Sequence, residues 1–86
     1  VGCIKLVELN YIDPGEYVLL ENICSFPCDL DGWTIKDDAT HLNVLDFSLS
    51  EKEKKKIDYE GRVWNDVGDS LYLRDNSGLL VIFYRY

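Results

Sequence analysis

The chain has 86 residues, of which 47% are hydrophobic and 29% are charged. A chain of this length closes one modest core, so we expect a single domain over residues 1–86 without a deep enclosed active site. Nine basic against sixteen acidic residues give a net charge of −7. Because cations that displace counterions from phosphates dominate nucleic-acid affinity, this charge disfavours direct DNA or RNA binding.

No apolar run is long enough to span a bilayer and no signal-peptide pattern is present, so we expect a soluble chain. The sequence contains no Met, and Val1 begins directly in an apolar run. We therefore expect a domain excised from a larger protein. The sequence does not determine the cellular compartment, although we weakly favour a secreted or cell-envelope protein.

Short runs of Val, Ile, Leu and Tyr, separated by Gly, Pro, Asp and Asn, recur along the whole chain. This pattern is typical of an all-β sandwich or barrel, here with about seven to eight mostly antiparallel strands. In chain order we expect strands at Cys3–Asn10, Glu16–Asn22, Trp33–Lys36, His41–Ser50, Tyr59–Val63, Ser70–Asp75 and Leu79–Tyr86.

The fourth and sixth of these segments predict the direction of individual side chains, because alternate residues of a strand face opposite sides of a sheet. In the fourth segment Leu42, Val44 and Phe47 are expected to point inward. In the sixth segment Leu71 and Leu73 are expected to point inward.

At most one short helical turn is expected, near residues 50–57. Ser50 and Glu53 have the spacing of a capping box, in which each residue satisfies a free backbone amide of the other. The lysine-rich run Lys52–Lys56 that follows is interpreted as part of a solvated loop or of this turn.

The stretch Val63–Gly78 is rich in side-chain oxygens, which raises the question of a cation site. An EF-hand calcium loop requires alternating Asp or Asn before its Gly and a Glu six residues later, and the stretch lacks that spacing. Asp and Asn in tight turns also hydrogen-bond to nearby backbone amides. We therefore interpret these residues as turn formers and expect no metal.

The cysteines are Cys3, Cys24 and Cys28, and the single histidine is His41. These four could form a Cys3His zinc site, but the usual close-spaced pairs are missing, so a small metal-binding domain is the least favoured function. An odd count allows at most one disulfide, and the sequence leaves the pairing open. No motif of nucleophilic catalysis accompanies His41, so we expect neither enzymatic activity nor a cofactor.

The final run, Leu79–Tyr84, contains no residue that would face water along a half-exposed strand. It is either an interior strand or a contact surface for a neighbouring domain or a second copy of the chain. The residues proposed for such a surface are Ile82, Phe83 and Tyr84, together with Tyr17 and Leu19 from the outer face of the second strand.

Four blocks cover the chain nearly end to end and together resemble the lamin tail domain family: Glu16–Asn22, Asp29–Asp38, Val63–Asp75 and Gly78–Tyr86. The resemblance implies an immunoglobulin-like β-sandwich without catalytic residues of its own. It implies structural roles for residues that start a core strand, pack beside it and form the following tight connection, namely Gly32, Trp33, Trp64, Asn65, Asp66, Gly68 and Asp69.

By the same resemblance, the expected function is that of a non-catalytic protein-interaction or tethering module. The alternative is an accessory domain that orients the substrate of an attached nuclease or other hydrolase. Related prokaryotic chains often carry polar residues where Ile82 and Phe83 stand here, which favours a covered surface on the last strand. The segment Leu49–Glu60 also departs from the family, with lysines in place of the usual Pro-Gly loop.

Overall fold

The computed structural model describes residues 2–12, 14–65 and 67–86, so the predicted role of Asp66 lies outside the described residues. Within these ranges the chain contains no helix. It therefore also lacks, in the described part, any helix long and apolar enough to cross a membrane. The described strands are β1 (Ile4–Asn10), β2 (Tyr17–Asn22), β3 (Cys28–Asp29), β4 (Thr34–Lys36), β5 (Leu42–Val44), β6 (Ser48–Leu49), β7 (Lys54–Asp58), β8 (Ser70–Arg74) and β9 (Leu80–Arg85).

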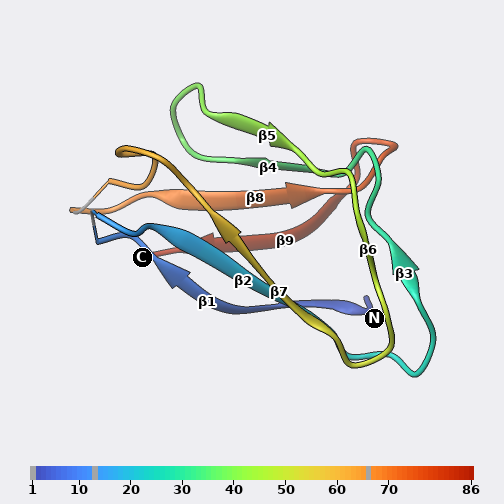
Figure 1. The fold of residues 1–86 in the computed structure, drawn as a ribbon. Helices are drawn as coiled ribbons and strands as arrows, with labels where there is room; N and C mark the ends of the chain where they lie inside the picture. Colours follow the sequence, from blue (N-terminus) through green and yellow to red (C-terminus); the bar gives the residue numbers. More distant parts are fainter. Residues whose placement is uncertain (1, 13, 66) are drawn as a thin grey trace.

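The strands form three antiparallel sheets, ordered β1-β2-β7, β3-β6 and β5-β4-β8-β9. Figure 1 shows β1, β2 and β7 layered against β4, β8 and β9, with the β3–β6 pair running across one end. The predicted all-β sandwich of mostly antiparallel strands is therefore confirmed.

The core lies between the two larger sheets and is built by alternation within each strand. In β8, Leu71 and Leu73 are fully buried, as predicted, while Arg74 is exposed. In β2, Val18 and Leu20 are fully buried on the same face. The buried hydrophobic residues are Ile4, Val18, Leu20, Leu30, Ile35, Leu45, Leu49, Trp64, Leu71 and Leu73.

The helical turn allowed near residues 50–57 does not form, and β7 occupies the second half of that segment. One half of the capping box forms, with the Ser50 amide donating to Glu53 Oε1 at 2.7 Å, whereas the Glu53 amide donates to the Ser50 backbone carbonyl at 3.1 Å. Lys52, however, has φ of 60°, which is incompatible with a right-handed helix. The chain turns back there, and β7 pairs along β2 from Tyr17 to Glu21, which satisfies more backbone groups than one helical turn would.

The predicted fourth strand is divided into β5 and β6, and the directions expected for two of its side chains are wrong. Leu42 and Val44 are each 60% exposed, whereas Leu45 is 2% exposed and packs in the core. β5 pairs with β4 so that Leu42 lies opposite Lys36, on the outer face of the sheet. Alternation predicts that two residues share a face, but it does not say which face is covered.

The strand predicted at Tyr59–Val63 is also absent from the described structure. This segment is held by individual hydrogen bonds instead of a ladder. The Tyr59 amide donates to the Glu16 carbonyl at 3.0 Å, and the Val63 amide donates to the Glu16 side chain at 2.9 Å. It therefore connects β7 to the Trp64 region without joining a sheet.

Candidate functional site

The oxygen-rich connection before β8 is organised by the carboxylate of Asp69. Its Oδ1 accepts the amides of Asp38 at 3.0 Å and Ser70 at 2.8 Å, and its Oδ2 accepts the Asn65 amide at 3.2 Å. Asn65 Oδ1 in turn accepts the Val67 amide at 3.2 Å. Both Asp69 oxygens are thus used to fix the backbone around the start of β8.

Asp75 has the same role in the turn between β8 and β9. Its Oδ1 accepts the Ser77 hydroxyl at 2.8 Å and the Leu79 amide at 2.9 Å. The hydrogen bond from the Ser77 side chain, followed by that from the Leu79 backbone, holds the pKa of Asp75 below its ordinary value. The side-chain oxygens of this stretch therefore stabilise turns.

The expected structural residues around the two tryptophans occupy constrained positions. Trp64 is 1% exposed and packs edge-on against Tyr59, with ring centroids 5.7 Å apart. Trp33 is only half-buried, and it packs against the rim of the core instead of anchoring its centre. Gly32 has φ of 83°, and a Cβ there would lie 3.3 Å from the Cβ of Asn76. A Cβ on Gly68 would lie 3.2 Å from the carbonyl oxygen of Tyr86.

The buried carboxylate of Glu16, which the sequence analysis did not single out, connects the start of β2 to the segment before β8. Glu16 is fully buried, and its Oε1 accepts the amides of Val63 at 2.9 Å and Trp64 at 3.0 Å. Its Oε2 and the Trp64 indole Nε1 are buried and have no hydrogen-bond partner among the residues that the structure describes. The sequence did carry a signal for this position. Glu16 lies two residues before Val18 and four before Leu20, so it faces the same inward side of the strand.

Asn22 continues the same inward series at the other end of β2. Its side-chain Nδ2 donates to the carbonyls of Phe26, Leu49 and Ser50 at 2.8, 3.2 and 3.1 Å. Its Oδ1 accepts the Cys24 amide at 3.0 Å. This amide therefore joins the end of β2 to the turn before β7, which explains why a polar residue occupies a fully buried position.

The four residues considered for zinc do not gather at one site. Cys3 and Cys24 form a disulfide, so neither is a free thiolate, and this also settles the pairing that the sequence left open. Burial, followed by the charge of Asp29, raises the pKa of the remaining thiol, Cys28. Among the described residues, no group of three or more His, Cys, Asp or Glu side chains is arranged to hold a metal ion.

His41 instead lies beside Asp37, with its Nδ1 2.6 Å from Asp37 Oδ2. The other oxygen of Asp37 accepts the amides of Ala39 and His41, so this carboxylate braces the turn between β4 and β5. The pair borders a cleft of about 490 Å³ beside Trp64. None of the described residues that line this cleft is Ser, Thr or Cys, so His41 has no side-chain nucleophile to activate there.

The last strand, β9, lies at the edge of the four-stranded sheet and pairs only with β8 among the described strands. The interior-strand interpretation is therefore wrong. Three large apolar side chains of β9 remain substantially exposed: Leu80 at 44%, Phe83 at 51% and Tyr84 at 44%. A polypeptide that covered β9 would bury these side chains and could also pair with its open edge.

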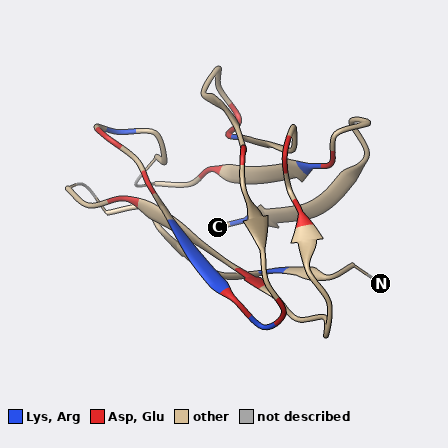
Figure 2. Ribbon diagram, turned by 45° about the vertical axis from the view of Figure 1, so that its right-hand side comes forward, with Lys and Arg blue, Asp and Glu red and all other residues tan. Residues whose placement is uncertain are grey.

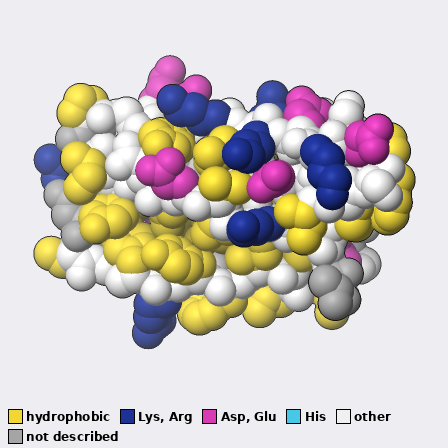
Figure 3. Space-filling model, turned by 90° about the horizontal axis from the view of Figure 1, so that it is seen from below, with side chains coloured by type: hydrophobic (Ala, Val, Ile, Leu, Met, Phe, Trp, Pro, Cys, Tyr) yellow, Lys and Arg dark blue, Asp and Glu magenta, His cyan; other side chains and the backbone are white. Residues whose placement is uncertain are grey.

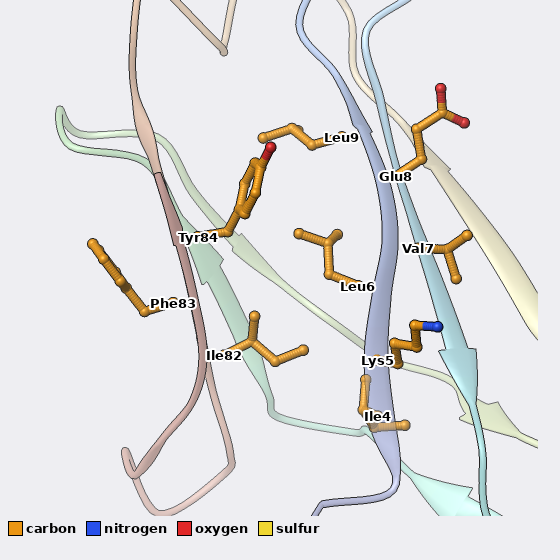
Figure 4. Close-up of a pocket in the computed structure, with 9 residues that line it drawn as sticks. All are labelled: Ile4, Lys5, Leu6, Val7, Glu8, Leu9, Ile82, Phe83 and Tyr84. Carbon is orange, nitrogen blue, oxygen red and sulfur yellow. The ribbon is translucent and has the colours of Figure 1, made fainter. Parts of the chain in front are cut away.

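A groove of about 330 Å³ separates β9 from β1, which is the edge of the three-stranded sheet. Figure 4 shows Ile82 and Tyr84 directed toward β1, where Leu6 and Leu9 face them, while Phe83 points away. The underside of the molecule in Figure 1, on which β1 lies, has a band of hydrophobic side chains bordered by charged ones (Figure 3). Hydrophobic side chains are thus exposed on this side, between the β1 and β9 edges that are unpaired among the described strands.

Tyr17 and Leu19 lie elsewhere, on the outer face of the three-stranded sheet. Lys56 Nζ is 4.5 Å from the ring centroid of Tyr17, and a hydrogen bond with the Glu8 carboxylate raises the pKa of the Tyr17 hydroxyl. Leu19 lies between Glu8 and Lys56 in the register of the sheet. Figure 2 shows the lysines of β7 as a continuous basic stretch along this layer.

The five residues that the sequence proposed for one contact surface therefore lie on three separate surfaces. Tyr17 and Leu19 share the charged face of the three-stranded sheet. Ile82 and Tyr84 line the groove between β1 and β9, and Phe83 lies on the outer face of the four-stranded sheet. The strand β9 therefore contributes to two of these surfaces.

No known protein-family model matches this sequence, and a search of curated proteins finds no matching relative.

Proposed function

We propose that this domain is a non-catalytic protein-interaction or tethering module of the lamin tail type, and that β9 is its principal contact element. The partner is a second protein, a neighbouring domain of the same polypeptide or a second copy of the chain. The resemblance to the lamin tail family supplies the class of function. The sandwich fold and the structural roles of Trp64, Asn65 and Asp69 support that resemblance.

The observation that carries the proposal is the position of β9. The most continuously apolar run of the chain forms an edge strand, with one edge unpaired among the described strands. Phe83 alone leaves about half of its surface exposed. That is roughly 100 Å², or about 2.5 kcal/mol if a partner covers it fully. Exposed apolar surface next to an open strand edge is typical of sites of strand addition.

The opposite sheet provides the internal comparison. Its outer face carries Lys5, Glu21 and Lys54 in one register row, so charges of both signs alternate there. Such a face is well solvated and offers little apolar area. A partner that buries apolar surface should therefore prefer β9 to the β7 side.

Site-specific photocrosslinking tests the proposal. The photoreactive amino acid p-benzoylphenylalanine replaces Phe83 or Tyr84 in the protein expressed in its native host, and replaces Lys54 or Lys56 as matched controls. We expect a discrete crosslinked polypeptide from positions 83 and 84 but not from 54 and 56. Crosslinks of the purified domain with itself would identify the partner as a second copy.

Two results would contradict the proposal. One is the absence of any crosslinked polypeptide from positions 83 and 84 in the host and in the purified domain at high concentration. The other is equal crosslinking from the control positions, which would mean that β9 is not preferred over the charged face.

A further inference from the structure

The outer face of the four-stranded sheet combines apolar and cationic side chains in two register rows. One row runs Leu42, Lys36, Tyr72, Phe83 across β5, β4, β8 and β9, and the next runs Val44, Thr34, Arg74, Leu80. Directly paired residues of antiparallel strands share a face, so the side chains of each row lie on the same side of the sheet. The β8–β9 register shifts between Leu73 and Arg74, and Leu80 joins the second row through its pairing with Arg74. Four residues of the two rows, Leu42, Val44, Leu80 and Phe83, are large apolar residues that are 44–60% exposed.

The charge of this face is opposite to that of the chain. Lys36 and Arg74 lie within the two rows, and Arg85 lies in the adjoining row opposite Ser70. Beside these rows, the Asp38 carboxylate accepts the Tyr72 hydroxyl at 2.8 Å and lies 4.0 Å from Arg85. The two rows themselves therefore contain two cations and no carboxylate, although the whole chain has a net charge of −7.

The two row cations retain binding capacity. Lys36 Nζ donates to the carbonyls of Asp37 and Ala39, and Arg74 Nη1 donates to that of Gly78 at 3.3 Å. Neither lies within 4.0 Å of a carboxylate among the residues that the structure describes. A guanidinium has five donors, so most of those on Arg74 are available to a carboxylate of a partner.

Between the cations, Tyr72 and Phe83 form an aromatic pair, with ring centroids 5.2 Å apart. Tyr, Phe and Arg are enriched in the centres of protein interfaces, because they supply large contact area together with directional hydrogen bonds. We propose that this face binds an acidic polypeptide segment, an inference that rests on the proposed interaction function. The carboxylates of the segment pair with Lys36 and Arg74, and its apolar side chains cover Tyr72 and Phe83.

Charge selects this occupant over two others. A second copy docked face to face would place like charges opposite each other, which disfavours self-association through this surface. A nucleic acid would meet only a few exposed cations on a strongly acidic chain, which gives little counterion release. An acidic polypeptide satisfies the cations and the apolar area at the same time.

The test uses short fluorescent peptides that share their Leu and Phe positions and carry Glu, Ser or Lys at all others, with a labelled single-stranded oligonucleotide in parallel. Anisotropy titrations with the wild-type protein should rank the peptides Glu, then Ser, then Lys. The double variant K36E/R74E should weaken binding of the Glu peptide by about tenfold, because attraction becomes repulsion at two positions.

The matched control is K54E/K56E, which makes the same change in net charge on the other sheet and should leave the affinity within about twofold. Because Lys36 also supports a turn, the neutral variant K36Q/R74Q provides a second measurement and should show an intermediate loss. Any one of four results would overturn the proposal of an acidic partner. These are equal binding of the three peptides, no binding of any of them, preference for the oligonucleotide, and equal losses in the two reversed variants. Crosslinking from Tyr84 in the groove, combined with any of those results, would leave the proposed interaction function standing.

Discussion

Replacement of Glu16 by alanine should destabilise the domain strongly, although Glu16 lies in none of the proposed contact surfaces. The substitution removes the acceptor for the amides of Val63, which is partly buried, and Trp64, which is buried, and leaves both without that partner. A donor that loses its acceptor on burial costs about 1–3 kcal/mol, so the two together amount to roughly 2–6 kcal/mol. A domain of this length has a total unfolding free energy of about 4–13 kcal/mol, so the loss would be a large fraction of it.

Urea unfolding followed by tryptophan fluorescence measures the effect. At a slope of about 2 kcal/mol per M, a loss of about 3 kcal/mol lowers the midpoint by about 1.5 M. Glu16→Gln keeps an oxygen acceptor and should lose less than half as much. Glu21→Ala, on the outer face of the same strand, should lose less than about 1 kcal/mol. A Glu16→Ala variant within about 1 kcal/mol of wild type, or no more destabilised than Glu21→Ala, would refute the assigned role.

The remaining predictions concern stability. Replacing both Cys3 and Cys24 by serine removes a disulfide that spans a sequence separation of 21 residues. This should lower the unfolding free energy by about 3 kcal/mol, whereas Cys28→Ser should lower it by less than about 1 kcal/mol. Comparable losses in the two variants would contradict this prediction. Gly32→Ala should cost about 1–2 kcal/mol in urea unfolding because its φ is 83°, and a neutral result would mean that the turn relaxes freely. The pKa of Asp75 is lowered in the fold, so its contribution is complete above the ordinary value of about 3.9 and is lost as pH falls through the lower folded value. The destabilisation caused by Asp75→Asn should therefore shrink below about pH 4, and a constant difference down to low pH would disprove that linkage.

Clean alternation was the most reliable guide to the fold. In β8 the sequence Ser-Leu-Tyr-Leu-Arg has one apolar face, and Leu71 and Leu73 are buried as predicted. β7 was missed because its three consecutive lysines show no alternation and have low strand propensity. Its strand conformation comes from pairing with β2, a long-range interaction that no local pattern of residues 54–58 encodes.

The candidate site was predictable only in part, for a similar reason. The apolar run of β9 was visible in the sequence, but its edge position depends on which strands become neighbours. The rows that join Leu42 and Lys36 to Tyr72 and Phe83 require the register of four strands that are distant in sequence. The inward phase of Glu16 and Asn22 was readable, whereas the amides and carbonyls that they bind come from other parts of the chain.

Hydrogen–deuterium exchange of the β9 amides tests the central claim most directly. Exchange is measured in the purified protein alone and in the complex isolated from its native host, with β7 as the reference edge strand of the other sheet. If β9 is the contact element, its amides should exchange more slowly in the complex while those of β7 keep their rate. Equal β9 exchange in both states, or protection confined to β7, would contradict the account.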